Sequence, residues 1–303
     1  MIDVQQVYKK YGSQLALNNL SFSIAKGEVV GFAGPNGAGK STIMKILTGY
    51  LAPTSGTALV NGYDVMQHSL DARRHIGYLP EHNPLYTEMY VKEYLGHVAS
   101  LYKLDKISTR VSQIVERVGL GKEQHKLIGA LSKGYRQRVG IAQTLMHDPE
   151  VLILDEPTTG LDPNQILEIR KLISELGTSK TILFSSHIMQ EVEAICTRTM
   201  IIYEGKLLLD CPTNELPLHT GNEADFNIRI ELDVMVEADF FLGIEGVISA
   251  KPEAAYTWVV AAQTDIRKAI FAHCVATGRV LMAMNLHKQT LEKVFYDFTM
   301  PQK

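Results

Sequence analysis

The sequence has little cysteine and no long apolar run. Its three cysteines, Cys196, Cys211 and Cys274, are far apart and odd in number, which argues against a disulfide framework and fits a reducing compartment. No run of about 20 apolar residues is present to span a bilayer. The first residues show no cationic start and no apolar core segment, so a signal peptide is not expected. We therefore expect a cytoplasmic chain whose membrane role, if it has one, comes through a partner.

An excess of one charge is also missing. The chain has 30 Lys and Arg against 33 Asp and Glu, a net charge of −3, and no basic stripe. Nucleic acid is therefore not expected as a partner. At 303 residues and 46% hydrophobic, the chain is long enough for two domains with real cores.

Two regions, residues 1–217 and 222–303, have different patterns and predict two domains. In the first region, short apolar runs at residues 29–32, 151–154 and 181–185 alternate with helical segments. This is typical of an α/β domain with a parallel sheet covered on both faces. Between about residues 81 and 148 the helical patterns dominate, which predicts a helical subdomain inserted into the α/β domain.

The second region follows Pro212, Pro217 and Gly221, which interrupt regular structure. Its expected elements are strands at 226–232, 246–250, 257–261 and 279–285, and helices at 266–277 and 290–298. If residues 234–241 are also helical, the order becomes βαββαβ. That order predicts a small C-terminal α+β domain of ferredoxin-like type.

The most informative motif is the glycine-rich stretch GPNGAGKS at residues 34–41, which fits the pattern G-x-x-x-x-G-K-[ST]. A buried strand is expected before it and a helix after it, and this context argues against a chance match. The glycines let the backbone N–H groups point at phosphates, and the helix start adds its positive end. The residues expected to bind ATP here are Gly34, Pro35, Asn36, Gly37, Ala38, Gly39, Lys40, Ser41 and Thr42, with the Ser41 hydroxyl also a ligand of Mg²⁺.

A second site is predicted where the apolar strand at 151–154 runs into Asp155 and Glu156. Ligands of parallel sheets lie beyond the carboxyl ends of the strands. We expect Asp155 to hold Mg²⁺, directly or through water, and Glu156 to act as general base on the attacking water. The alternative, a strand that simply ends in solvent with two acids, is disfavoured by the phosphate loop.

These motifs, in this order, resemble those of the nucleotide-binding subunit of an ABC transporter over residues 1 to about 217. LSKGYRQR at residues 131–138 resembles the family signature, usually LSGGQ, and residues 159–162 resemble the D-loop. His187 resembles the switch histidine of the family. Tyr11, expected before the first strands, resembles the aromatic residue that stacks on adenine.

The resemblance implies a P-loop ATPase in which ATP lies between two chains. One chain would offer its phosphate loop, Asp155, Glu156 and His187. A second copy, or a related ATPase chain, would offer Ser132 and Gly134 to the γ-phosphate. The implied cofactors are ATP and Mg²⁺. The implied partners are separate integral membrane permease subunits, with the ATPase peripheral on the inner face of the cell membrane.

The sequences of residues 76–86, IGYLPEHNPLY, and of the signature are similar to those of one branch of the family. That branch comprises ATPases of bacterial exporters of the gliding-motility-associated and drug or polysaccharide kind. Glu81 stands where the family usually has a glutamine that contacts Mg²⁺ and water and senses the membrane partner. A carboxylate can accept from water or approach Mg²⁺ but cannot donate a hydrogen bond. Lys133 replaces a glycine of the signature and is expected to face solvent, since lysine is strongly hydrated.

Other interpretations remain open at this stage. Tyr11 and His187 could be structural, and Asp162 could serve only to cap a helix that starts at Pro163. The competing function is a soluble ABC ATPase that acts on ribosomes or nucleic acid. The mildly acidic charge, the single ATPase unit and the lack of a long coiled-coil insert argue against it. A regulator that senses ATP without hydrolysis is disfavoured by Glu156 and His187.

Overall fold

The structure is a computed structural model, and it describes residues 1–219 and 226–286. The chain divides into two compact units after Asn214, near the boundary predicted at residue 217. In the described residues, no helix is both long and apolar enough to cross a bilayer.

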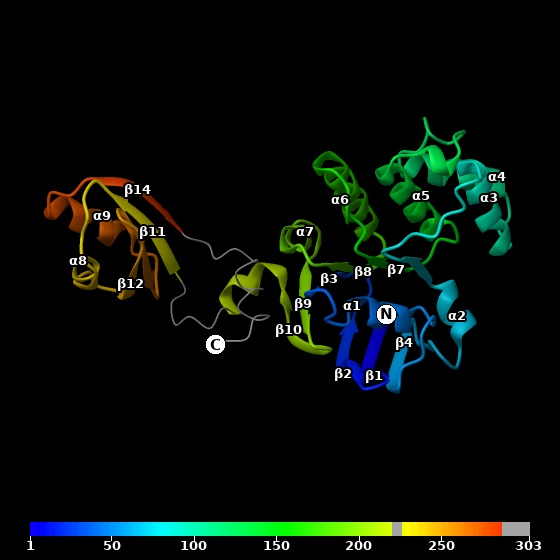
Figure 1. Cartoon of the computed structure of the whole chain (residues 1–303), viewed down its shortest axis with the longest axis horizontal. Coiled ribbons are helices and arrows are strands. Elements are labelled where there is room, and N and C mark those ends of the chain that lie inside the picture. The colour runs from blue at the N-terminus through cyan, green and yellow to red at the C-terminus, as the bar shows by residue number, and fades with distance from the viewer. Residues whose placement is uncertain (220–225, 287–303) are drawn as a thin grey trace. The chain divides into compact units, whose positions relative to one another are not determined.

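The first unit is built on a six-stranded sheet of order β10-β9-β3-β8-β7-β6 (Figure 1). The strands β6, β7, β8, β3 and β9 are parallel, and β10 pairs antiparallel with β9. All residues of β3, β7 and β8 are buried, which confirms the predicted parallel sheet covered on both faces. The bounds of these strands are β3 Val29–Ala33, β6 Ile76–Leu79, β7 Val151–Asp155, β8 Thr181–Ser186, β9 Arg198–Tyr203 and β10 Lys206–Pro212.

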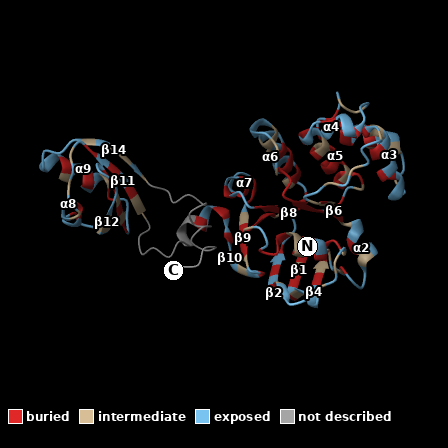
Figure 2. Ribbon diagram, viewed as in Figure 1, coloured by how far each residue is buried: buried red, intermediate tan, exposed pale blue. Residues whose placement is uncertain are grey.

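Three helices pack on this sheet: α1 (Lys40–Leu47), α6 (Pro163–Gly177) and α7 (Met189–Ile195). Their apolar sides are buried and their outer sides are exposed (Figure 2). The phosphate loop lies between β3 and α1, and the start of α6 and α7 follows the ends of β7 and β8. The sheet therefore gathers the predicted motifs at the carboxyl ends of its strands.

A second sheet, antiparallel and of order β2-β1-β4-β5, was not predicted from the sequence. Its strands are β1 Ile2–Tyr11, β2 Gln14–Ile24, β4 Ser55–Val60 and β5 Tyr63–Asp64. It shares one hydrophobic core with α1 and the parallel sheet, and the short helix α2 (Ser69–Arg74) leads from it to β6. The expectation that Tyr11 precedes the first strands is wrong, because Tyr11 ends β1. Irregular pairing between β1 and β2 breaks the alternation that would have marked β1 as a strand.

The helical subdomain lies between β6 and β7 in the chain. It consists of α3 (Val91–Leu101), α4 (Ile107–Arg117), the 3₁₀ turn η1 (Ile128–Ala130) and α5 (Lys133–Leu145). The three α-helices pack on one another beside the edge strand β6 (Figure 1). This is the predicted helical insertion.

The second unit has the order β11 (Phe226–Leu232), α8 (Asp239–Leu242), β12 (Val247–Ala254), β13 (Thr257–Ala262), α9 (Arg267–Ala276) and β14 (Leu281–Leu286). Its antiparallel sheet has the order β12-β13-β11-β14, which confirms the ferredoxin-like fold. The helix expected over residues 234–241 is reduced to the four residues of α8. Valines at 234 and 236 favour extended backbone over helix. The helix predicted at 290–298 lies outside the described residues.

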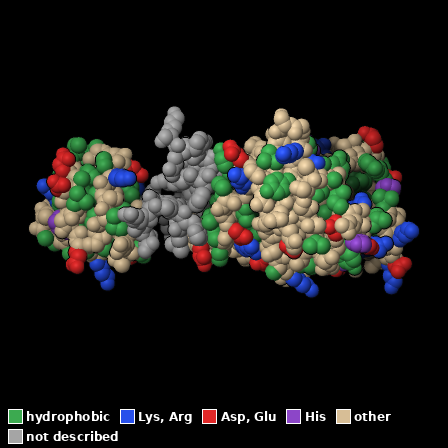
Figure 3. All heavy atoms as spheres, turned by 90° about the horizontal axis from the view of Figure 1, so that it is seen from below, with side chains coloured by type: hydrophobic (Ala, Val, Ile, Leu, Met, Phe, Trp, Pro, Cys, Tyr) green, Lys and Arg blue, Asp and Glu red, His purple; other side chains and the backbone are tan. Residues whose placement is uncertain are grey.

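Positive and negative side chains are interspersed on the surface. On the face shown in Figure 3, Lys and Arg lie among Asp and Glu, with no band of one sign. This pattern agrees with the nearly balanced composition.

Candidate functional site

The phosphate loop turns sharply between the end of β3 and the start of α1, and two of its glycines are required by close packing. A Cβ on Gly34 would lie 2.5 Å from the carbonyl oxygen of Ile202. A Cβ on Gly39 would lie 2.7 Å from the carbonyl oxygen of Ala16, and Gly39 also has a φ of +110°. Only glycine fits both the space and the backbone angle. The loop is therefore held close to the neighbouring strands, with its N–H groups at the start of α1.

Lys40, the first residue of α1, is only 6% exposed. Its Nζ donates to the carbonyl oxygens of Gly34 (2.6 Å) and Pro35 (3.2 Å). The same Nζ lies 3.5 Å from Oε1 of Glu156. The ammonium group thus joins the phosphate loop to the acidic end of β7.

Asp155, the last residue of β7, is 1% exposed. Its Oδ1 accepts a hydrogen bond from the Ser185 hydroxyl at 2.7 Å. Burial raises the pKa of the Asp155 carboxyl above its usual value, and hydrogen bonds from Ser185 and Ser41 oppose this shift. The Ser41 hydroxyl thus lies on the same side of the site as the Asp155 carboxyl and favours its charged form.

Glu156 and His187 form a hydrogen-bonded pair. Oε2 of Glu156 contacts Nδ1 of His187 at 2.8 Å and accepts from the Thr159 hydroxyl at 3.1 Å. Glu156 is buried and has a φ of +49°. A left-handed backbone at a residue other than glycine costs energy and is often found at functional sites. The backbone N–H of Glu156 donates to the Ser185 hydroxyl at 2.9 Å, which helps to hold this conformation.

Lys40, Glu156 and His187 line one pocket of about 600 Å³, whereas Gly34, Ala38 and Asp155 are not among its lining residues. Tyr11, which is 46% exposed, lies at this pocket, and Lys9 places its Nζ 5.2 Å from the centre of the Tyr11 ring. Of the residues predicted from the sequence, those that line the pocket are Tyr11, Pro35, Asn36, Gly37, Gly39, Lys40, Ser41, Thr42, Glu81, Glu156 and His187. Gln14, Ala16 and Thr159 also line it and were not predicted to do so.

Comparisons with known proteins show the family of this chain. A family model described as ABC transporter matches residues 17–159. The chain is 38% identical to the bacitracin transport ATP-binding protein BcrA of Bacillus licheniformis over 75% of each chain. The chain belongs to the ABC transporter family of ATP-binding proteins. It is 30% identical to the linearmycin resistance ATP-binding protein LnrL of Bacillus subtilis (strain 168), over 99% of this chain and 98% of that one.

A solved structure supports the same assignment. The chain matches cbiO1 of Clostridium perfringens, part of the ABC transporter complex cbiONQ, with a TM-score of 0.66 and 31% identity. The match covers 72% of this chain and 90% of that one. The protein is thus an ATP-binding and ATP-hydrolysing subunit of an ABC transporter, which confirms the transporter interpretation over that of a soluble ATPase acting on ribosomes or nucleic acid.

The signature of this ABC subunit lies away from its own pocket. Ser132 caps α5, since its hydroxyl accepts from the N–H of Tyr135 at 3.4 Å. Gly134 is buried against the side chain of Gln165 at the start of α6. Neither Ser132 nor Gly134 lines the pocket that contains Lys40. Lys133 is exposed, and its ammonium group lies against Gly160 of the D-loop.

Several polar residues support the site, and of these only Asp162 was considered from the sequence. Asp162 caps α6 by accepting from the N–H of Gln165 at 3.0 Å, as one of the sequence interpretations held. Gln137 of α5 donates to the carbonyl oxygen of Pro157 at 2.7 Å and so ties the helical subdomain to the segment after Glu156. Ser185, near the end of β8, and Glu191, in the first turn of α7, are both buried. No sequence motif identifies Ser185 or Glu191 as a supporting residue, because their roles depend on contacts between distant segments.

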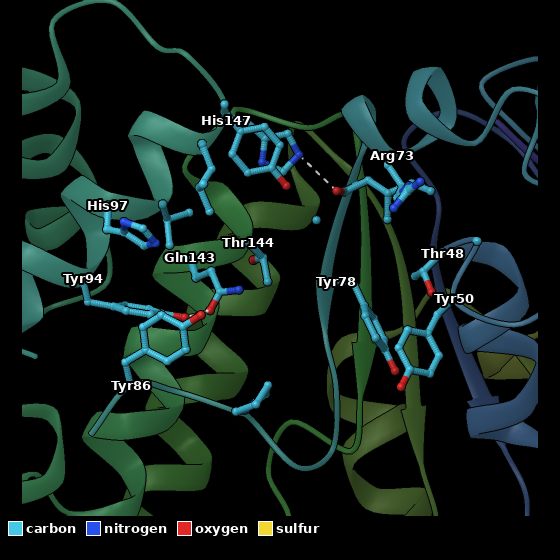
Figure 4. Close-up of a pocket in the computed structure, with 17 residues that line it drawn as sticks. Thr48, Tyr50, Arg73, Tyr78, Tyr86, Tyr94, His97, Gln143, Thr144 and His147 are labelled. Carbon is cyan, nitrogen blue, oxygen red and sulfur yellow. Dashed lines mark hydrogen bonds between the residues drawn. The ribbon is translucent and has the colours of Figure 1, made fainter. Parts of the chain in front are cut away.

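The ABC subunit has a second pocket, of about 620 Å³, between the edge strand β6 and the helical subdomain (Figure 4). Tyr94 donates to Oε1 of Gln143 at 2.5 Å, and the rings of Tyr102 and His147 stack at 4.0 Å. Burial lowers the pKa of the His147 imidazole below its usual value. The pocket is lined by aromatic side chains, two histidines and one arginine, with no Asp or Glu among the described lining residues; they include Tyr50, Arg73, Tyr78, Tyr86, Tyr94, His97, Tyr102 and His147.

Proposed function

We propose that this subunit powers a bacterial export transporter of the drug, polysaccharide or gliding-motility-associated type. The observation that carries this proposal is the similarity to LnrL, a protein named for linearmycin resistance, over nearly the whole length of both chains. The similarity extends beyond the ATPase unit into the region of the C-terminal domain. BcrA, named for bacitracin transport, supports the same type of cargo.

In the proposed mechanism, the loop N–H groups and Lys40 bind the phosphates of ATP. Ser41, Asp155 and Glu81 would hold Mg²⁺, since hard oxygen ligands suit this ion. Ser41 and Glu81 line the pocket, and Asp155 ends the adjacent strand β7. When bound, Mg²⁺ would supply positive charge to the phosphate oxygens. Glu156 takes the proton of the attacking water, and His187 fixes the orientation of its carboxylate. The left-handed backbone of Glu156 keeps that carboxylate buried beside Lys40.

The site is completed by a second chain, either another copy or a related ATPase. Ser132 and Gly134 lie at the start of the 13-residue helix α5, where free N–H groups and the helix dipole favour an anion. Because they do not line their own chain's pocket, a second chain can present them to the γ-phosphate. ATP would then hold two chains together, and hydrolysis would release them.

The membrane partner would dock in the second pocket, a groove between β6 and the helical subdomain. The subunit would then lie on the inner face of the cell membrane. The aromatic walls of this groove favour an apolar segment, and Arg73 favours an acidic group on that segment. Glu81 follows β6, whose residues Ile76, Gly77 and Tyr78 line the groove, while Glu81 itself lines the nucleotide pocket. The segment from β6 to Glu81 thus connects the permease contact with the ATP site.

Copurification with the permease tests this proposal. Arg73→Glu should abolish recovery of a multi-helix membrane partner from detergent-solubilised membranes. Arg74→Glu is the matched control, since Arg74 is adjacent, exposed and absent from the groove. Equal recovery of a permease with both variants would refute the docking site, and no permease with the wild-type chain would refute the transporter assignment.

A further inference from the structure

Glu191, on α7, is a buried carboxylate outside the nucleotide pocket. It is 1% exposed. Its Oε2 accepts from the hydroxyls of Thr158 (2.6 Å) and Ser186 (2.8 Å). Its other oxygen, Oε1, faces the guanidinium of Arg170 on α6 at 4.0 Å. Buried acids are rare unless they are paired or hydrogen-bonded, so this position calls for an explanation.

The two hydroxyls flank the Glu156–His187 pair. Thr158 is two residues after Glu156, and Ser186 directly precedes His187. The Ser186 hydroxyl also accepts from the N–H of Ile188 at 3.0 Å, so it fixes the backbone on both sides of His187. One carboxylate therefore ties the segment after β7 to the segment after β8.

This tie adds to the one made by Ser185. Ser185 joins Asp155 to the N–H of Glu156 at the ends of the two strands. Glu191 makes a second connection between the same two segments, through Thr158 and Ser186. Glu191 does not line the nucleotide pocket, so it can affect the reaction only through the residues that it holds.

We propose that Glu191 is a positioning residue for the Glu156–His187 pair. This inference rests on the catalytic roles proposed for Glu156 and His187. Without the carboxylate, the hydroxyls of Thr158 and Ser186 lose a buried acceptor, and the two segments are free to move apart. A displacement of about 1 Å at a catalytic group can cost about 100-fold in rate.

The test compares ATP hydrolysis by Glu191→Ala, Glu191→Gln and the wild-type full-length chain. Glu191→Ala should lower kcat by about 10- to 100-fold and leave KM for ATP within about 2-fold, because ATP binding does not involve this residue. Glu191→Gln should restore most of the rate, since its amide oxygen can accept from both hydroxyls. Glu193→Ala, an exposed acid on the same helix, is the matched control and should behave as wild type.

The double variant Glu191→Ala/Glu156→Gln separates positioning from general stability. If Glu191 acts by positioning the base, the double variant should be no slower than Glu156→Gln alone. A folded Glu191→Ala protein with wild-type kcat, or losses that multiply in the double variant, would overturn the proposal. Should Glu191→Ala fail to fold, Thr158→Val, which removes one donor without a cavity, must lower kcat at constant KM.

The failure of this inference is distinct from a failure of the proposed mechanism. If Glu156→Gln and His187→Ala both keep wild-type turnover, the mechanism itself is refuted, and the role of Glu191 falls with it. If those two variants lose activity while Glu191→Ala and Thr158→Val do not, only the role of Glu191 is refuted.

Discussion

Replacement of Glu156 by glutamine is the most informative single change at the nucleotide site. The amide has the shape of the carboxylate, and its oxygen can accept from Thr159 and contact His187 in the place of Oε2. The amide nitrogen would then face Lys40, whose ammonium keeps its bonds to the Gly34 and Pro35 carbonyls. The fold of the loop is therefore preserved while the base is lost.

The expected effect on rate follows from the loss of general base catalysis, which typically contributes about 10²- to 10⁴-fold. At about 1.4 kcal/mol per tenfold, this corresponds to roughly 3 to 5 kcal/mol of transition-state stabilisation. Affinity for ATP should be no weaker than in the wild type. The carboxylate 3.5 Å from Lys40 competes with the phosphates for the ammonium and repels them, and the amide does neither.

The assay is phosphate release at saturating Mg²⁺ and ATP, with nucleotide binding measured separately on the same protein. Glu193→Gln, an exposed residue of α7, controls for the loss of a carboxylate elsewhere. Turnover by Glu156→Gln within about 3-fold of wild type would refute the general-base role, because that loss is below the range expected for a base.

Three further changes test the loop and the domain division. Lys40→Ala should abolish measurable ATP binding, whereas Lys45→Ala, on the same helix but outside the pocket, should retain it; micromolar affinity in Lys40→Ala would contradict the phosphate role. Gly39→Ala should lower the free energy of unfolding by about 1 to 3 kcal/mol in thermal or denaturant melts, because of the positive φ of Gly39 and the close carbonyl oxygen of Ala16. The loss should be smaller for Gly37→Ala, whose Cβ would meet nothing within 4 Å. Truncation after Leu216 should leave ATP affinity unchanged by calorimetry, since every residue that lines the pocket lies in the first unit; lost affinity would show that the C-terminal domain supports the site.

The motifs whose residues are close together in the chain could be predicted from the sequence. The phosphate loop is defined by glycines whose spacing reflects close backbone contacts, as Gly34 and Gly39 show. Asp155 ends, and Glu156 follows, a strand that is otherwise apolar because it is buried in the centre of a parallel sheet. Such features are encoded within a few consecutive residues, so no knowledge of the tertiary structure is needed to find them.

The features that the sequence did not reveal depend on contacts between distant segments. The antiparallel sheet was missed because a left-handed residue, Gln6, and shifts in register interrupt the alternation of β1. The expected position of Tyr11, before the first strands, is wrong for the same reason, since Tyr11 ends β1. Glu191 is recognisable as a buried acid only once Thr158 and Ser186 are seen beside it.

The central claim is that each ATP site combines the phosphate loop of one chain with the signature of another, and mixing two inactive variants tests it most directly. Lys40→Ala and Ser132→Arg should each abolish hydrolysis alone. In a two-fold symmetric dimer, a mixed pair has one site with both changes and one with neither, so an equal mixture should recover about a quarter of the wild-type rate. A mixture that forms mixed dimers and stays as inactive as either variant would contradict the account.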